Sequence, residues 1–217
     1  MEDLIKTVEI EDYWWPEDVG QQYRFSLKRV KSLHKVIEIC KRLNRTRVVV
    51  QAGGSIGVWP RILSKHFSWV YTFEPEPISF HCLCKNVQEP NVTKIQAALG
   101  NFHNGVEITK VKLTSHHVAN GKLGHIPQLC IDDLSLIVCD AVLLDIEGWE
   151  TNALMGARST IISSCPIILV ETRINKEADK KKNQDIETLM RSLNYEKILD
   201  IELDTIYAHK TDKPKIC

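Results

Sequence analysis

The sequence predicts an α/β protein built on a doubly wound, mostly parallel sheet that ends in an antiparallel hairpin. Short apolar runs alternate with amphipathic stretches, a pattern typical of parallel βαβ units. The apolar runs are continuous, which predicts strands covered by helices on both faces. The last two runs, 195–201 and 205–209, are separated by three residues. Because such a short link cannot contain a crossover helix, we expect this pair to form the antiparallel hairpin.

The first 46 residues contain no strand-like run. From Phe25 to Leu43, apolar residues recur at three- and four-residue steps, which predicts an amphipathic helix. We interpret its Lys and Arg residues as a solvated face rather than a phosphate site. The aromatic run Tyr13–Trp15 suits an anchor on the main domain better than a lid. We therefore expect a helical extension over 1–46 and one main domain over 47–217.

The main domain alternates strands and helices. Its apolar runs predict parallel strands at 48–52, 69–73, 92–99, 141–146 and 167–171. The intervening patterns predict helices at about 57–67, 78–88, 150–163 and 184–193. Three further segments are expected to be an alternating strand at 105–113, a loop from Thr114 to Ile126 that contains Asn120-Gly121, and a mobile charged loop from Lys176 to Lys182.

Composition limits the partners and the cellular compartment. Lys plus Arg and Asp plus Glu both number 28, so the net charge is zero and no long-range field attracts nucleic acid. The amino-terminal residues are acidic, and no apolar run approaches the roughly 18 residues of a membrane span. Seven scattered cysteines predict free thiols in a reducing compartment, so we expect a cytoplasmic protein. Cys82 and Cys84 are expected to be buried helix residues rather than zinc ligands.

The residues that follow the first two strands indicate a ligand. In doubly wound sheets, ligands bind at the carboxyl ends of the strands. Gly53, Gly54, Ser55 and Gly57 follow the first strand and permit close backbone approach, and Glu74 follows the second. A carboxylate at that point can accept both hydroxyls of a ribose, which predicts a cofactor that contains adenosine. The same residues would also suit an NAD(P)-dependent oxidoreductase.

The stretch from Val48 to Glu171 resembles the FkbM family of class I S-adenosylmethionine-dependent methyltransferases. The matching motifs occur in one order along the chain: Gly53–Gly57, Phe73–Pro77, Asn91–Val92, Ala97–Asn101, Ile131–Leu134, Leu144–Glu150, Ala153–Ala157 and Ile168–Glu171. The resemblance implies a Rossmann-like fold with S-adenosylmethionine as cofactor. It further implies methyl transfer to an oxygen of a sugar, a glycan or another small metabolite.

The resemblance also assigns the cofactor-binding residues. It places Glu74 and Pro75 at the ribose, the segment Gly53–Gly57 under the methionine part, and Ala97, Ala98 and Leu99 beside the adenine. The chain departs from the family at Gln51, where relatives carry an acid. Glutamine retains hydrogen-bonding capacity but lacks the charge that attracts the cofactor's ammonium group. A module that binds the cofactor without transferring methyl therefore stays open as a further alternative.

Methyl transfer to a hydroxyl requires an aligned acceptor and a group that removes its proton. Asp145 and Glu147 follow the fourth strand and Glu171 follows the fifth, so we expect all three acids near the reaction. Asp145 is the first choice for the floor of the pocket and also a candidate contact of the cofactor; its alternative role is to cap the helix that begins near Gly148. Carboxylate pairs alone do not define a metal site, so no metal is predicted.

His116 and His117 are alternative bases, because histidine exchanges protons near neutral pH. Both lie in the predicted loop from Thr114 to Ile126. We expect the acceptor pocket to be built from residues 1–46 and 101–130, because acceptor pockets of this fold class are formed by loops and added helices. The sequence predicts neither the acceptor nor the oligomeric state.

Overall fold

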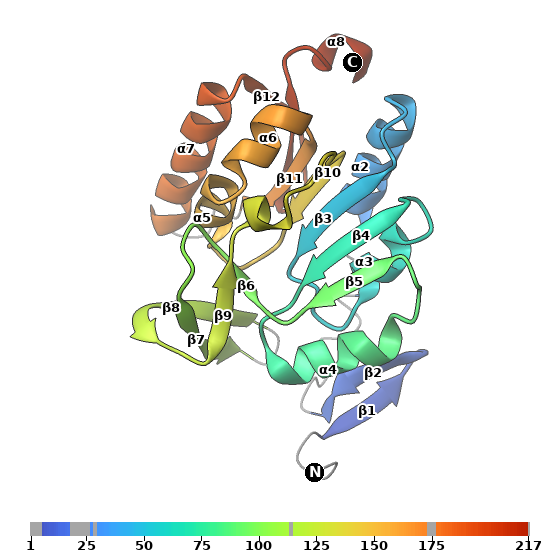
Figure 1. The fold of residues 1–217 in the computed structure, drawn as a ribbon, viewed down its shortest axis with the longest axis vertical. Helices are drawn as coiled ribbons and strands as arrows, with labels where there is room; N and C mark the ends of the chain where they lie inside the picture. The colour runs from blue at the N-terminus through green and yellow to red at the C-terminus, as the bar shows by residue number, and fades with distance from the viewer. Residues whose placement is uncertain (1–5, 18–26, 28–29, 113–114, 173–176, 217) are drawn as a thin grey trace.

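The computed structural model describes residues 6–17, 27, 30–112, 115–172 and 177–216, with the backbone alone at 109–112, 115–123 and 177–178. A seven-stranded sheet forms the centre (Figure 1). Its strands, in spatial order, are β12 (Tyr195–Ile201), β13 (Asp204–His209), β11 (Ile167–Glu171), β10 (Ala141–Leu144), β3 (Val48–Ala52), β4 (Trp69–Phe73) and β5 (Val92–Ile95). Only β13 runs opposite to the other six strands, so the predicted α/β fold with a closing hairpin is confirmed.

Helices cover both faces of this sheet (Figure 1). One layer consists of α2 (Lys31–Arg42), α3 (Val58–Leu63) and α4 (Pro77–Asn86), and the other of α5 (Glu150–Met155), α6 (Arg158–Ser164) and α7 (Glu177–Ser192). Because side chains alternate along a strand, Val49 and Leu143 pack under the first layer, whereas Val50 and Leu144 pack under the second. The two buried clusters explain why the strands are apolar at every position.

The predicted strand 92–99 divides between two sheets. β5 ends at Ile95, and β6 (Ala98–Leu99) belongs to a separate sheet of order β6-β9-β7-β8. Its other strands are β7 (Gly105–Lys112), β8 (Ser115–Leu123) and β9 (Ile126–Leu129).

The prediction of a loop from Thr114 to Ile126 is therefore wrong. Most of that segment is β8, which pairs antiparallel with β7. Ile108 lies opposite Val118 in this pair. The segment is a strand because its backbone pairs with β7, and the sequence pattern does not show that pairing.

The amino-terminal segment contains strands that the sequence did not predict. β1 (Thr7–Ile10) and β2 (Tyr13–Pro16) form a hairpin through Glu11 and Asp12, whose φ angles are 51° and 63°. Trp15 is buried, and the main-chain N–H and C=O of Trp14 bond to the Asn86 side chain at 2.7 and 2.8 Å. The hairpin packs on α4, so the expected anchoring role of these aromatics is confirmed (Figure 1).

Two helical predictions also need correction. The helix expected over 150–163 is divided into α5 and α6 around Gly156. The loop expected from 176 to 182 is wrong for residues 177–182, which form the first turns of α7. That helix is fixed because Ile186 and Met190 are buried against the sheet and because Lys182 contacts Glu150.

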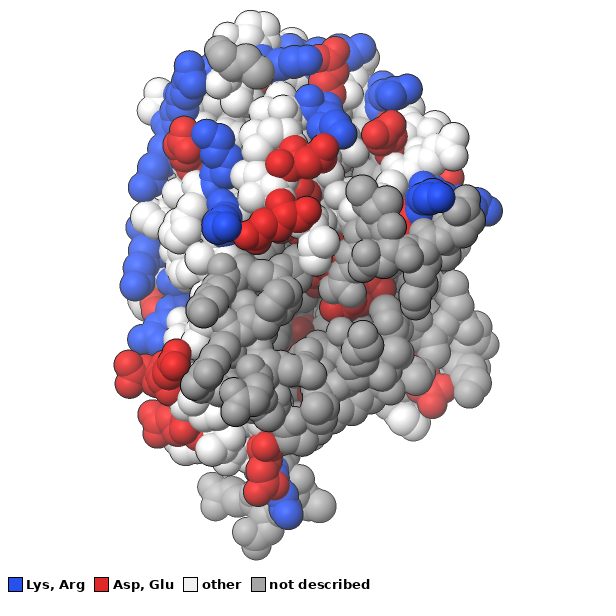
Figure 2. Space-filling model, turned by 180° about the vertical axis from the view of Figure 1, so that it is seen from behind, with Lys and Arg blue, Asp and Glu red and all other residues white. Residues whose placement is uncertain are grey.

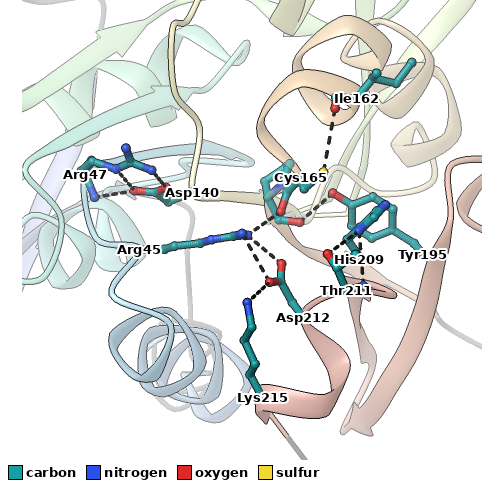
Figure 3. Close-up of polar contacts among 11 residues, drawn as sticks. Arg45, Arg47, Asp140, Ile162, Cys165, Tyr195, His209, Thr211, Asp212 and Lys215 are labelled. Atoms are coloured by element: carbon teal, nitrogen blue, oxygen red, sulfur yellow. Dashed lines mark hydrogen bonds and ion pairs between the residues drawn. The ribbon is translucent and has the colours of Figure 1, made fainter.

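Polar contacts join distant segments at the edge opposite the carboxyl ends of the parallel strands (Figure 3). Arg45 forms an ion pair of 2.8 Å with Asp212 and donates a hydrogen bond to the Cys165 carbonyl oxygen. Arg47 pairs with the buried Asp140 at 2.7 Å. Arg45 and Arg47, which we expected on the solvated face with the other basic residues of this segment, therefore join distant parts of the fold.

The described surface mixes both signs of charge. Figure 2 shows Lys and Arg side chains interspersed with Asp and Glu on one face of the molecule. The six cysteines within the described ranges are free, with Cys82 buried and Cys84 half-buried on α4. Among the helices that the structure describes, none combines the length and apolar character needed to cross a membrane.

Candidate functional site

The loop after β3 brings backbone against the end of β10. Gly53 has φ +82° and donates its N–H to the Phe73 carbonyl oxygen at 3.1 Å. A Cβ at this position would lie 1.9 Å from the Asp145 carbonyl oxygen. Only glycine satisfies both the left-handed conformation and this close approach. Gly53 therefore sets how closely the ends of two neighbouring strands meet.

The rest of the glycine loop contacts the end of β4 and the segment after α4. The Gly54 N–H also donates to the Phe73 carbonyl oxygen, and Gly57 has φ +102°. A Cβ on Gly57 would lie 2.5 Å from a methyl carbon of Val87, so the loop packs directly on the segment after α4. The helix that follows, α3, has six residues and is shorter than the predicted 57–67. Ser55 remains exposed at the turn.

Glu74 lies at the carboxyl end of β4 beside this loop. Its side chain is buried, with Oε2 accepting from the Ser55 N–H at 2.7 Å and Oε1 from the Glu76 N–H at 2.9 Å. Burial raises the pKa of the carboxyl group to about 7, although both backbone hydrogen bonds act in the opposite direction. Each carboxylate oxygen can accept a further hydrogen bond. The site thus presents a fixed acceptor pair, followed along the chain by the half-buried Pro75.

Two buried donors belong to segments at the same edge of the sheet. Gln51 is fully buried, and its Oε1 accepts from the Thr72 hydroxyl at 2.6 Å. Its Nε2 has no acceptor among the residues that the structure describes, and neither has Nε1 of Trp149. Buried donors normally have partners, so these atoms can serve a group supplied by a ligand.

The acids after β10 and β11 occupy different environments. Asp145 is half-buried, and its N–H donates to the Ala52 carbonyl oxygen. The N-cap position of α5 is Trp149, not Asp145. Glu147 is half-buried with a φ of 57°, and Glu171 is buried at the end of β11. The structure therefore places the three predicted catalytic acids at the ends of neighbouring strands, as expected from their positions in the sequence.

The fully buried Glu150 fixes the loop that carries Asp145 and Glu147. Its Oε1 accepts from the N–H groups of Ile146 and Gly148, and its Oε2 pairs with Lys182 at 3.2 Å. The same Lys182 ammonium donates to the Glu171 carbonyl oxygen. The sequence could not reveal this link, because the run of charged residues around Lys182 predicts a solvent-exposed loop.

The residues expected beside adenine form a buried strip. Ala97, Ala98 and Leu99 are at most 3% exposed, and Ala97 and Leu99 pack in the same core cluster as Phe73. The strip continues along β6, and the Gly100 N–H donates to the Leu129 carbonyl oxygen of β9. The second sheet therefore rests against this part of the site.

The predicted histidine bases lie on β8, where His117 is opposite Thr109 and His116 is opposite Lys110 on β7. Their side chains fall outside the described residues, so a role as base stays a prediction.

A cavity of about 580 Å³ lies between the start of α4 and the second sheet. It is lined by Pro77, Val106, Glu107, Ile108, Gly124, His125 and Ile126. Pro77 follows the turn that carries Glu74, so the cavity adjoins the candidate site. Glu107 and His125 were not among the site residues predicted from the sequence. The only signal for them was their position in the segment 101–130, which we expected to shape an acceptor pocket.

Comparisons with known proteins agree with this geometry. The family model for the methyltransferase FkbM domain matches residues 51–197. No curated protein sequence matches the chain.

Solved structures show the same fold. An FkbM methyltransferase from Methylobacillus flagellatus KT superposes with a TM-score of 0.53 at 19% identity, over 74% of this chain and 43% of that one. An rRNA methylase from Streptococcus thermophilus gives 0.53 at 12% identity, over 82% and 93%. The magnesium protoporphyrin IX methyltransferase from Synechocystis PCC 6803, solved with bound SAM, gives 0.52 at 10% identity, over 89% and 88%. The central sheet is that of the class I methyltransferases.

Proposed function

Because this chain belongs to the FkbM family of methyltransferases, we propose that it transfers a methyl group from S-adenosylmethionine to a hydroxyl of a sugar or another small metabolite. The observation that carries the proposal is the buried carboxylate of Glu74, which two backbone N–H groups hold beside a glycine loop. The family match favours this cofactor over a nicotinamide dinucleotide, which the glycines and Glu74 alone would also suit. The chain spans 43% of the FkbM methyltransferase with which it was superposed, so the activity is inferred for this domain.

The residues present fit S-adenosylmethionine. Glu74 can accept both ribose hydroxyls, and the buried Nε2 of Gln51 can donate to the carboxylate of the cofactor's methionine part, although it cannot accept from the ammonium group as an acid at this position would. Gly53–Gly57 would pass under the methionine part, and the strip Ala97–Leu99 would border the adenine. When bound, the cofactor supplies an electrophilic methyl carbon on its sulfonium.

The chain itself must orient the acceptor and remove a proton from its hydroxyl. We assign the removal of this proton to Asp145. Its half-buried carboxylate lies directly after β10, and its main chain contacts Gly53. Glu147 and Glu171 are the other two acids that we expect near the reaction, and His117 is the alternative base. The buried Glu150 holds the loop around Asp145 in place and so acts as a positioning residue.

We place the acceptor against the second sheet. The cavity of about 580 Å³ has apolar walls, and its polar groups come from Glu107 and His125. Such a combination suits a hydroxylated small molecule better than a polyanion. The interspersed charges of the described surface support the same choice.

Calorimetric titration tests the cofactor assignment. The protein should bind S-adenosylhomocysteine and not NAD. Glu74→Ala should weaken that binding by about 2–3 kcal/mol, because two charge-assisted hydrogen bonds are lost. Glu38→Ala, which removes a carboxylate exposed on α2, is the matched control and should bind normally. Binding of NAD alone, or unchanged affinity in Glu74→Ala, would remove the proposal's main support.

A transfer assay tests the reaction. Radiolabelled methyl should pass from the cofactor to a component of a mixture of sugars and hydroxylated metabolites, and Asp145→Asn should lower kcat by about 10²–10⁴-fold. Binding of S-adenosylhomocysteine without transfer to any acceptor would favour a cofactor-binding module instead.

A further inference from the structure

Three side chains with different donor atoms meet where the loop after β6 reaches the short helix η3 (Ile131–Leu134). Nε2 of His103 lies 2.9 and 2.8 Å from the two carboxylate oxygens of Asp133. The thiol of Cys130 completes the group, and the three donor atoms all lie within 4.8 Å of one another. Within the described residues, this is the one place where three such side chains come together.

The short helix fixes two of the three groups. Cys130 is the residue that caps η3; its N–H donates to Oδ2 of Asp133 at 2.8 Å, and its side chain accepts from the Asp133 N–H. Residues three apart eclipse in a 3₁₀ helix, so the spacing Cys-x-x-Asp places the thiol and the carboxylate on one side. The neighbouring Asp132 is committed elsewhere, because it accepts from the backbone N–H groups of Ser159 and Thr160. The local geometry therefore selects Asp133 as the acid of the cluster.

We propose that His103, Cys130 and Asp133 form a zinc-binding site. One nitrogen, one sulfur and one oxygen donor form a set that zinc accepts readily, whereas magnesium and calcium require oxygen ligands. Zinc–ligand bonds of about 2.0–2.3 Å place tetrahedral ligand atoms about 3.3–3.6 Å apart. The contact between His103 and Asp133 would thus widen by about half an ångström as the ion replaces the shared proton. On binding, Cys130 loses its thiol proton to solvent, and the proton that Nε2 of His103 shares with Asp133 is replaced by one on Nδ1, so the imidazole stays neutral. A water completes the fourth position.

The zinc site uses none of the residues proposed for methyl transfer and does not depend on them. It lies at the loop that follows Gly100, beside the start of α6, to which Asp132 is bonded. A bound ion would join the loop around the exposed His103 to the buried Cys130. Its expected consequence is a more stable attachment of the second sheet to the core.

Metal titration of the untagged, chelator-treated protein over residues 1–217 tests the site. Calorimetry should show one Zn²⁺ per chain. Substitution with Co²⁺ should produce the near-ultraviolet absorbance of a thiolate–cobalt bond. His103→Ala and Asp133→Asn should each weaken binding at least about 10-fold, and Cys130→Ser should remove the absorbance. Saturating Zn²⁺ should raise the melting temperature by about 5 °C.

Matched variants separate this site from other thiols and histidines. Cys84→Ser and His125→Ala should keep full zinc affinity, since neither residue belongs to the cluster. Circular dichroism of each metal-free variant checks folding, and the exposed His103 provides a substitution that leaves the core intact. Absence of binding at millimolar Zn²⁺, or unchanged affinity in His103→Ala and Asp133→Asn, would refute the site.

Discussion

The Glu74 carboxyl group is buried at 7% exposure, which raises its pKa to about 7 from an ordinary value of 4.5. Because the folded-state value is the higher one, this group stabilises the ligand-free fold fully only below about pH 4.5. That contribution is lost as the pH rises through 7. Ribose hydroxyls donate hydrogen bonds, so they favour the carboxylate form. Burial therefore raises the pKa of Glu74, whereas cofactor binding lowers it.

The affinity for S-adenosylhomocysteine should consequently rise with pH. Between pH 6 and 8 we expect about a 10-fold gain, because the ligand-free carboxyl group loses its proton over this range. Calorimetry at several pH values measures the change. Glu74→Gln cannot titrate and should bind weakly with little pH dependence. An equally steep rise in Glu74→Gln would show that another group is responsible.

Two glycines with positive φ provide a matched test of the loop geometry. Gly53→Ala would place a methyl group 1.9 Å from the Asp145 carbonyl oxygen, whereas a Cβ at Gly148 meets no atom within 4 Å. Gly148→Ala should cost about 1 kcal/mol from backbone strain alone. Gly53→Ala should cost at least about 3 kcal/mol and abolish S-adenosylhomocysteine binding. Urea denaturation and calorimetry check both, and equal effects would contradict the close packing of the loop.

Residue roles that follow directly from strand ends could be predicted from the sequence. Gly53 and Glu74 follow apolar runs, and parallel strands bring their carboxyl ends to one edge. Glu107 and His125 were missed because their place on the cavity depends on how the second sheet packs against α4. Likewise, Glu150 is buried beside Asp145 only because α7 supplies Lys182. Contacts of this kind are properties of packing rather than of local pattern.

At the scale of elements, one buried ion pair adds to the apolar contacts that attach α7 to the sheet. Lys182 contacts both the Glu150 carboxylate and the Glu171 carbonyl oxygen, so the helix links the ends of β10 and β11. Breaking a buried pair leaves a charge without compensation, which costs far more than losing an exposed pair.

Lys182→Met should therefore destabilise the protein by about 3 kcal/mol. The neighbouring Lys181 is exposed, so Lys181→Met should change stability by less than about 0.5 kcal/mol. Chemical denaturation followed by circular dichroism compares the two variants. A similar small effect in both would mean that the contact contributes little to docking of α7.

Elements with strong periodicity were predicted well, and elements defined by long-range pairing were not. The parallel strands and α2 followed from apolar patterns alone. β8 was missed because its segment, with two histidines and Asn-Gly, reads as a turn, yet β7 pairs with it. The hairpin of β1 and β2 lacks the Asn-Gly or Asp-Gly turn that normally marks such a structure. Its turn residues, Glu11 and Asp12, nevertheless adopt positive φ.

At the scale of the whole molecule, Asn86 connects the amino-terminal hairpin to the glycine loop. Its Nδ2 donates to the carbonyl oxygens of Trp14 and Ile56, and its Oδ1 accepts from the Trp14 N–H. Ile56 lies within the loop Gly53–Gly57, so one side chain bridges residues far apart in the sequence.

Asn86→Ala should lower stability by about 2–3 kcal/mol, since it leaves buried backbone groups without partners. It should also weaken S-adenosylhomocysteine binding about 3–10-fold, because the glycine loop loses a support. Gln88→Ala, at an exposed residue that bonds only to nearby carbonyl oxygens, is the control. Thermal denaturation and calorimetry measure both effects. Loss of stability with unchanged affinity would limit Asn86 to holding the hairpin.

The contacts that join α2 and the turn after it to residues 204–216 also constrain the order of assembly. The Ser32 hydroxyl donates to buried Asp204, Arg45 pairs with Asp212, and Arg42 donates to the Ile216 carbonyl oxygen, over separations of 167–174 residues. Contacts that distant form slowly. During synthesis, α2 is therefore made well before the segment from Asp204 onward that contains its partners. We therefore expect its apolar side to need shielding during translation, for example by a chaperone.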